Sequence, residues 1–132
     1  MGRLTAVMIA TILVAGCMRP RVAVREPCRN RVLESVPAPG GSVKAVIFER
    51  HCQAPTGYST QVSLVAAADP VGQEPGNVFI AGNGGRVPRP RSFVTVAWTG
   101  PARLTVNFEA DAAVFKAEPK VGGVDIAYAR HQ

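Results

Sequence analysis

The side chains best suited to hydrolytic chemistry lie close together near residue 50. Glu49 and His51 are separated by one residue, and the hydroxyls of Ser59 and Thr60 follow shortly afterwards. A hydrolase needs a nucleophile beside a base, two positioned carboxylates or a metal. Ser and Thr that alternate with apolar residues are, however, typical of an ordinary strand face. We therefore expect no catalytic residue, and we keep a hydrolase that uses His51 or Glu49 as the alternative.

Cys28 and Cys52 have a spacing that favours a disulfide over a metal site. A metal site would have to add His51 and His131, the only two histidines. Neighbouring residues on a strand point to opposite faces, so His51 and Cys52 would not face one ion, and the chain lacks a C-x-x-C zinc motif. Two cysteines of a small domain pair with each other in an oxidising compartment. The sequence predicts a Cys28–Cys52 disulfide, with no metal and no cofactor.

The segment 86–91 contains three arginines that are candidates for binding an anion or a partner. Arg86, Arg89 and Arg91 alternate with prolines, which restrict the conformations of the segment. Guanidinium groups bind carboxylates and phosphates through paired N–H bonds. We expect this segment to be either a solvated basic loop or a site for a carboxylate or phosphate on a protein, lipid or polyanionic glycan.

The N-terminus carries an apolar segment between a charged start and a cysteine. Leu4 to Val14 is apolar except for Thr5 and Thr11. This run is shorter than the roughly 20 residues that span a membrane, and it suits a signal peptide. The residues that follow, Leu13-Val14-Ala15-Gly16-Cys17, resemble the lipobox of bacterial lipoproteins. The resemblance implies that residues 1–16 are removed and that Cys17 receives diacylglycerol and an amide-linked acyl chain such as palmitate.

Two other interpretations of the N-terminus are an ordinary secretory signal cut elsewhere and a helix of the core. The lipoprotein interpretation has a physical rationale, because one acyl chain binds a membrane only marginally and several chains make an anchor persist. Met18 follows Cys17 where an aspartate would retain such a protein in the inner membrane. In a Gram-negative cell we therefore expect an outer-membrane lipoprotein of the cell envelope that faces the periplasm.

The mature chain would be basic, especially just after Cys17. Removal of Arg3 leaves 15 − 1 = 14 Lys and Arg against 9 Asp and Glu, a formal charge of +5. Arginines at 19, 21 and 25 lie within residues 17–27, which we interpret as a basic tether. Each cation near an anionic membrane contributes about 1 kcal/mol of attraction. No aromatic residues interleave with these arginines, so we expect no nucleic-acid partner.

Apolar residues recur at every second position through residues 28–132, which predicts one β-domain. We expect a small antiparallel sandwich or barrel-like meander of about eight short strands. The predicted strands are Arg31 to Val36, Ser42 to Cys52, Tyr58 to Ala66, Asn77 to Ala81, Phe93 to Trp98, Leu104 to Phe108, Val114 to Ala117 and Val124 to Tyr128.

Three of these strands carry predictions about individual faces. Residues 42–52 are apolar on both faces and are expected to form a central strand. Residues 58–66 are expected to be half-buried, with Ser59, Gln61 and Ser63 on the exposed face. Trp98, the lone tryptophan, is expected in the core.

Three runs resemble a group of small, uncharacterised exported bacterial proteins. They are Phe48 to Cys52, Thr56 to Ser63 and Gly76 to Phe79. The resemblance covers roughly two thirds of the mature chain by motif order. The resemblance implies no activity, because the group has no assigned function. In the pattern of that group an acidic residue stands at the position of His51. Together these patterns predict a lipid-anchored envelope protein that acts as a binding or structural module.

Overall fold

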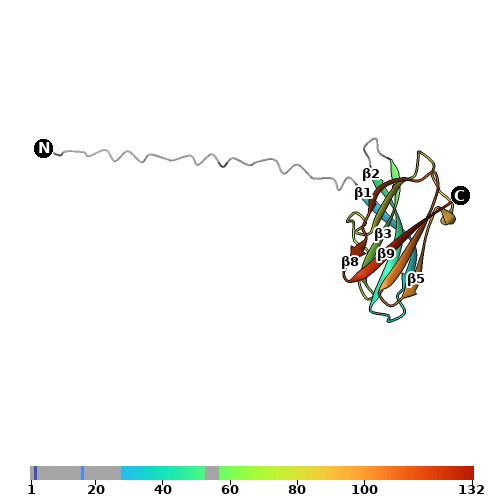
Figure 1. The fold of residues 1–132 in the computed structure, drawn as a ribbon. Helices are drawn as coiled ribbons and strands as arrows, with labels where there is room; N and C mark the ends of the chain where they lie inside the picture. Colours follow the sequence, from blue (N-terminus) through green and yellow to red (C-terminus); the bar gives the residue numbers. More distant parts are fainter. Residues whose placement is uncertain (1, 3–15, 17–27, 53–56) are drawn as a thin grey trace.

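The computed structural model describes residues 2, 16, 28–52 and 57–132, and the described residues from Cys28 onward form an all-β structure (Figure 1). The elements are β1 (Cys28–Pro37), β2 (Val43–Cys52), β3 (Tyr58–Ala66), β4 (Phe79–Gly82), η1 (Arg91–Phe93), β5 (Val94–Gly100), β6 (Arg103–Glu109), β7 (Ala113–Ala117), β8 (Lys120–Val121) and β9 (Val124–His131). The eight predicted strands are all present, and β8 is an additional short one.

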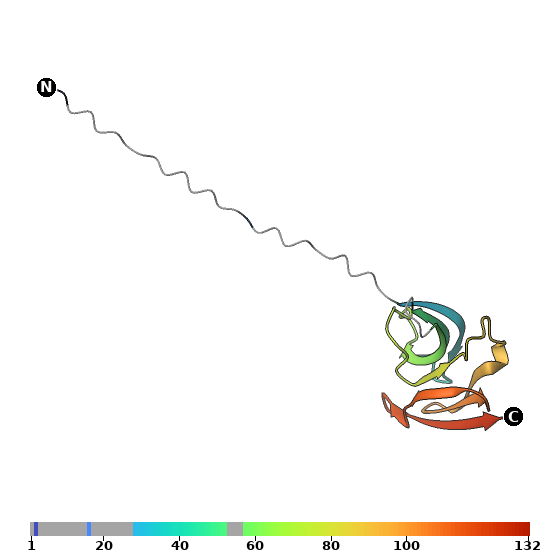
Figure 2. The ribbon, with the colours of Figure 1, turned by 90° about the horizontal axis from the view of Figure 1, so that it is seen from above.

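The strands form two layers packed face to face. One sheet has the order β1-β2-β3-β4-β7, and the other has the order β5-β6-β9-β8. Seen from above, the second sheet lies as a separate layer against the more strongly curved first sheet (Figure 2). Of the two predicted arrangements, the sandwich is therefore the one that forms.

Most neighbouring strands are antiparallel, but β6 and β9 run parallel. The first four strands of the larger sheet are consecutive in the chain and form hairpin-like neighbours. After β6 the chain crosses to β7 at the edge of the larger sheet and returns through β8 to β9. A parallel pair requires a crossover of this kind. The sequence pattern does not predict it, because alternation is the same in parallel and antiparallel strands with one exposed face.

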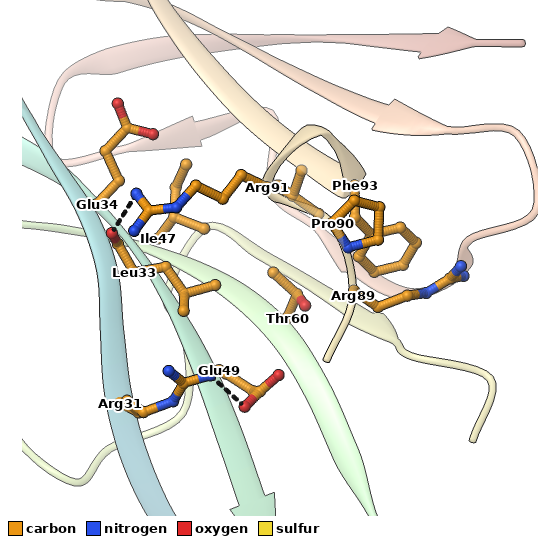
Figure 3. A pocket seen from close by; sticks show the side chains of 11 residues that line it. Arg31, Leu33, Glu34, Ile47, Glu49, Thr60, Arg89, Pro90, Arg91 and Phe93 are labelled. Carbon is orange, nitrogen blue, oxygen red and sulfur yellow. Dashed lines mark hydrogen bonds and ion pairs between the residues drawn. The ribbon is translucent and has the colours of Figure 1, made fainter. Parts of the chain in front are cut away.

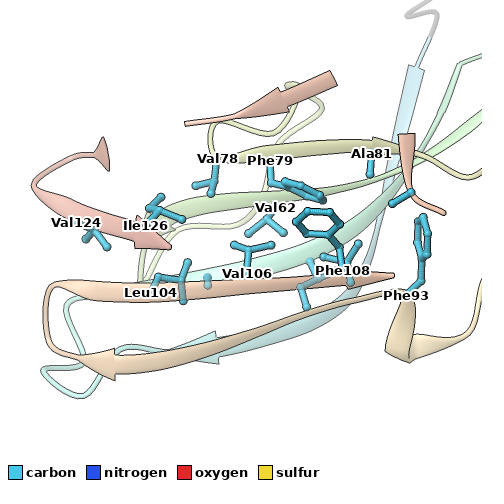
Figure 4. Close-up of a cluster of buried hydrophobic side chains, with 14 residues drawn as sticks. Val62, Val78, Phe79, Ala81, Phe93, Leu104, Val106, Phe108, Val124 and Ile126 are labelled. Carbon is cyan, nitrogen blue, oxygen red and sulfur yellow. The ribbon is translucent and has the colours of Figure 1, made fainter. Parts of the chain in front are cut away.

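Apolar side chains from both layers meet in one core (Figure 4). The ring of Phe79 lies 5.1 Å from that of Phe108 and 5.8 Å from that of Tyr128, measured between centroids. Burying an aromatic or branched apolar side chain contributes about 1.5–3 kcal/mol. On β9, Val124 and Ile126 are buried in this core, and Tyr128 packs partly buried against it.

The outer face of β3 is not exposed, contrary to the sequence prediction. Gln61 and Ser63 are only 4% and 6% exposed. The segment between β3 and β4 folds back over them, and its backbone N–H groups at Gly76 and Asn77 donate to Gln61 Oε1 (2.6 Å) and Ser63 Oγ (3.2 Å). A Cβ at position 76 would lie 2.8 Å from a backbone oxygen, so only glycine fits this close approach. The sequence pattern could not reveal this cover because the segment is irregular.

Side-chain hydrogen bonds tie the two sheets together. Trp98 on β5 donates from Nε1 to the carbonyl of Val36 on β1 (2.9 Å), and it packs half-buried against the core as predicted. On the other sheet edge, the hydroxyl of Tyr128 on β9 donates to the Glu118 carbonyl (2.6 Å), with the Val78 carbonyl 3.1 Å away. These bonds fix how the sheets align.

The predicted Cys28–Cys52 disulfide is present. It joins the first residue of β1 to the last residue of β2, which face each other in the strand register. We call this end of the sandwich the disulfide end. It also carries the loop between β4 and η1, residues 83–90, because β4 ends opposite the start of β3.

Candidate binding surface at the disulfide end

A buried carboxylate lies at the centre of the disulfide end. Glu49 is 5% exposed, and the strand register places it between Arg31 on β1 and Thr60 on β3. Arg31 donates from Nη2 to Glu49 Oε1 at 3.0 Å (Figure 3). The Arg31 side chain is 66% exposed, so water screens this pair and its contribution to stability is small.

Asn83 connects Glu49 to the loop that covers it. Its amide accepts a hydrogen bond from the Thr60 hydroxyl at 2.8 Å and makes a longer 3.5 Å contact to Glu49 Oε2. Gly84 and Gly85 follow with φ values of 62° and 75°, and the Arg86 N–H closes the turn on the Asn83 carbonyl. Two consecutive positive φ angles are those of a type I′ turn, for which Asn-Gly-Gly is well suited. Asn83 and Arg31 are the members of this site that the sequence prediction missed.

The arginines of residues 86–91 do not converge on one point. The Arg89 side chain is only 5% exposed, and its guanidinium lies 4.0 Å over the Phe93 ring. It pairs with Asp111 (3.1 Å) and with Glu109 (3.8 Å), while its Nε has no hydrogen-bond partner among the described residues. Arg89 is therefore engaged in holding its loop against the turn after β6.

Arg86 and Arg91 leave the loop in different directions. Arg86 is 72% exposed and lies 4.0 Å from Asp111. Arg91 is exposed and donates from Nη1 to the carbonyl of Leu33 on β1, a long bond of 3.4 Å. Figure 3 shows Arg91 and Arg31 on opposite sides of the opening above Glu49 and Thr60. Arg91 and Arg31 therefore flank this opening, and Arg89 also lines it while its guanidinium pairs with Glu109 and Asp111.

The opening is a cavity of about 40 Å³ that Arg31, Glu49, Thr60 and Arg91 help to line. One water molecule needs a cavity volume of about 10–15 Å³, so this cavity holds a few waters or one small polar group. A wider, shallow depression of about 620 Å³ adjoins it and shares Arg31 and Glu49. It also includes Arg29. Four arginines therefore line the two contiguous hollows at the disulfide end, namely Arg29, Arg31, Arg89 and Arg91.

The candidate catalytic groups are occupied by other contacts. The imidazole of His51 stacks on the ring of Tyr58, with centroids 4.1 Å apart and 13° between the planes. The Thr60 hydroxyl donates to Asn83, and the Ser59 hydroxyl accepts from Gln61. Among the described residues, neither hydroxyl donates a hydrogen bond to His51 or Glu49, as a nucleophile would to its base.

The remaining sequence-predicted residues have simpler outcomes. Cys28 and Cys52 are bonded to each other, and no cluster of three potential metal ligands occurs among the described residues. Cys17, the signal peptide 1–16 apart from Gly16 and Gly2, and the tether 17–27 lie outside the described residues. Within the part of the chain that the structure describes, no helix is long and apolar enough to cross a membrane.

Comparison with known protein families, with curated proteins and with solved structures found no match to this chain.

Proposed function

We propose that this protein is a lipid-anchored protein of a bacterial cell envelope and that its β-domain is a binding module for an acidic group on an envelope protein or glycan. The lipobox-like run ending at Cys17 supports the anchor. The disulfide supports an oxidising compartment. Facing the periplasm from the outer membrane, as Met18 favours, the domain would meet both kinds of partner.

The observation that carries the binding proposal is the arrangement of Arg31 and Arg91 around the small cavity that also contains Glu49 and Thr60. Arg31 and Arg91 are exposed but each is oriented by a contact within the protein, to Glu49 and to the Leu33 carbonyl. An oriented guanidinium loses less side-chain entropy when it binds a carboxylate or phosphate. The arrangement therefore suits recognition of an anion at this end of the domain.

Labelling of Cys17 tests the anchor. In cells grown with labelled palmitate, the wild-type chain is expected to incorporate the label, and Cys17→Ser is expected to lose both the label and membrane association. A Cys17→Ser protein that remains equally membrane-bound would contradict the anchor.

Cross-linking of the full chain in envelope fractions tests the binding module. We expect a stoichiometric partner that is lost in Arg31→Gln/Arg91→Gln, because these changes remove the charges but keep an N–H donor. The matched control is Arg103→Gln/Lys120→Gln, which removes two exposed cations elsewhere in the domain. Equal loss in both pairs, or no partner with wild type, would contradict the proposal.

A hydrolase remains the second candidate because Glu49 and His51 both line the larger hollow. It predicts a hydrolytic activity of envelope preparations that Glu49→Gln or His51→Asn abolishes. Such an activity, in the absence of a binding partner, would favour the enzyme over the binding module.

A further inference from the structure

Exposed apolar side chains accompany the arginines at the disulfide end. Val87 is 45% exposed and Phe115 is 74% exposed. Both line one apolar depression of about 880 Å³, which Cys52 also lines. Phe115 is a large apolar side chain on the surface, and such residues grouped together mark an interaction site.

The position of Phe115 is fixed by its contact with β4. A Cβ built on Gly82 would lie 3.0 Å from the Phe115 ring, so the ring rests directly on the glycine backbone. The strand register of β4 and β7 is irregular at this point, between Ile80 and Ala81. An aromatic ring held outward in this way keeps its apolar area available to a partner.

The tip of the loop between β4 and η1 combines charge and apolar area. Arg86, Val87 and Pro88 are all exposed. Val87 also lines the hollow that contains Arg29, so cationic and apolar groups alternate across the disulfide end. Membrane-surface segments have this composition, because apolar groups enter the headgroup region while cations bind anionic lipids.

The chain outside the sandwich limits what can meet this surface. Cys28, where β1 begins, is eleven residues after Cys17. Eleven fully extended residues span at most about 40 Å. Because Cys17 is the proposed lipid anchor, a connection of this length keeps the disulfide end close to the bilayer. Strand β1 then runs away from the membrane.

We propose that the disulfide end is a membrane-contacting surface that rests on the bilayer holding the anchor. Val87 and Phe115 enter the headgroup region, and Arg29 and Arg86 bind the phosphates of anionic lipids. The tether arginines at 19, 21 and 25 add to the same attraction. Arg91, which donates to the Leu33 carbonyl and lines only the small cavity, is not part of this surface, and with Arg31 it remains the site for an envelope partner.

Vesicle binding of the mature-length chain carrying Cys17→Ser tests this surface without the anchor. We expect it to bind vesicles that contain phosphatidylglycerol and to bind pure phosphatidylcholine vesicles weakly, with binding that falls as salt rises. Arg29→Gln/Arg86→Gln is expected to lower the partition coefficient about 30-fold, since each cation near an anionic surface contributes about fivefold. Val87→Ser/Phe115→Ser is expected to weaken binding without changing its salt dependence.

Arg103→Gln/Lys120→Gln is the control, because it removes the same charge and keeps the disulfide end intact. Equal weakening in this control would show attraction to net charge alone and would overturn the proposal. Wild-type binding by Arg29→Gln/Arg86→Gln would assign all the attraction to the tether and would also overturn it. A protein partner lost from that variant, with vesicle binding unchanged, would identify a protein interface instead. Palmitate labelling of the wild-type chain reports the anchor separately, so a wild-type chain that is labelled, together with a Cys17→Ser chain that fails to bind vesicles, contradicts only this surface.

Discussion

Glu49 shows how a residue that looks chemically reactive in the sequence can be used for structure. Its carboxylate is buried on the inner face of β2, where Arg31 and Asn83 contact its two oxygens. Thr60, whose hydroxyl was a candidate nucleophile, donates its hydroxyl proton to Asn83. Buried polar groups must be paired, because an unpaired one costs about 1–3 kcal/mol. The network therefore explains how the carboxylate of Glu49 can be buried.

Asn83 is the residue on which this network depends most. It is 1% exposed, and Asn83→Ala would leave both Thr60 and Glu49 short of a partner. We expect a loss of about 2 kcal/mol in the free energy of unfolding, measured by urea denaturation. Asn77→Ala is the control, because the Asn77 side chain likewise makes two hydrogen bonds, here to the backbone of Leu64, but is exposed to water that can replace it. The interpretation fails if the two variants lose the same stability.

At the scale of the elements, alternation of apolar residues was enough to predict where strands form. It located eight of the nine strands found in the described residues, and the position of β2 between two other strands. It failed on the outer face of β3, because Gln61 and Ser63 are buried by an irregular segment rather than by another strand. Local patterns record the nature of a side chain but not what folds over it.

The candidate site was predictable only in part for a similar reason. The Cys28–Cys52 pair could be predicted, because these two cysteines remain once Cys17 is assigned to the lipid, and such a pair forms a disulfide in an oxidising compartment. The directions in which the loop arginines point could not be predicted, because Arg89 is held by two acids much further along the chain, Glu109 and Asp111. Contacts of this range depend on the strand order, and the crossover from β6 through β7 to β9 sets that order.

Tyr128 links the two sheets and makes their association depend on pH. Burial, and secondarily the nearby charge of Glu118, raises the pKa of Tyr128 from 10.0 to about 12. An unfolded chain would lose this proton near pH 10, whereas the folded protein keeps it to about pH 12. Stability from the hydroxyl is therefore complete below pH 10 and is lost as pH rises through 12.

Tyr128→Phe isolates this effect. At neutral pH we expect the variant to be less stable by about 1 kcal/mol, because it lacks the bond to the Glu118 carbonyl. The difference between the two proteins should shrink between pH 10 and pH 12, measured by thermal unfolding at each pH. A difference that stays constant across this range would show that the hydroxyl titrates equally in both states.

At the scale of the whole molecule, the two ends of the sandwich differ in chemistry. The disulfide end gathers Arg29, Arg31, Arg86 and Arg91 together with Val87 and Phe115, although these residues come from four segments of the chain. Trp98 lies away from the disulfide end, and its hydrogen bond to the Val36 carbonyl joins the two sheets. The fold thus concentrates candidate binding groups where the proposed tether joins the domain.

The disulfide is expected to hold this end together. It closes a loop whose ends are 24 residues apart, and restricting the unfolded chain over such a loop stabilises a protein by about 3 kcal/mol. In the chain carrying Cys17→Ser, we expect Cys28→Ser/Cys52→Ser to lose about this amount in urea unfolding. A reductant should lower the parent protein to the level of the double variant and leave the variant unchanged. If the reductant destabilises both proteins equally, or if the two proteins unfold at the same urea concentration, the disulfide does not stabilise the domain. The positions of Arg29 and Arg31 then depend on the hydrogen bonds between β1 and β2 alone.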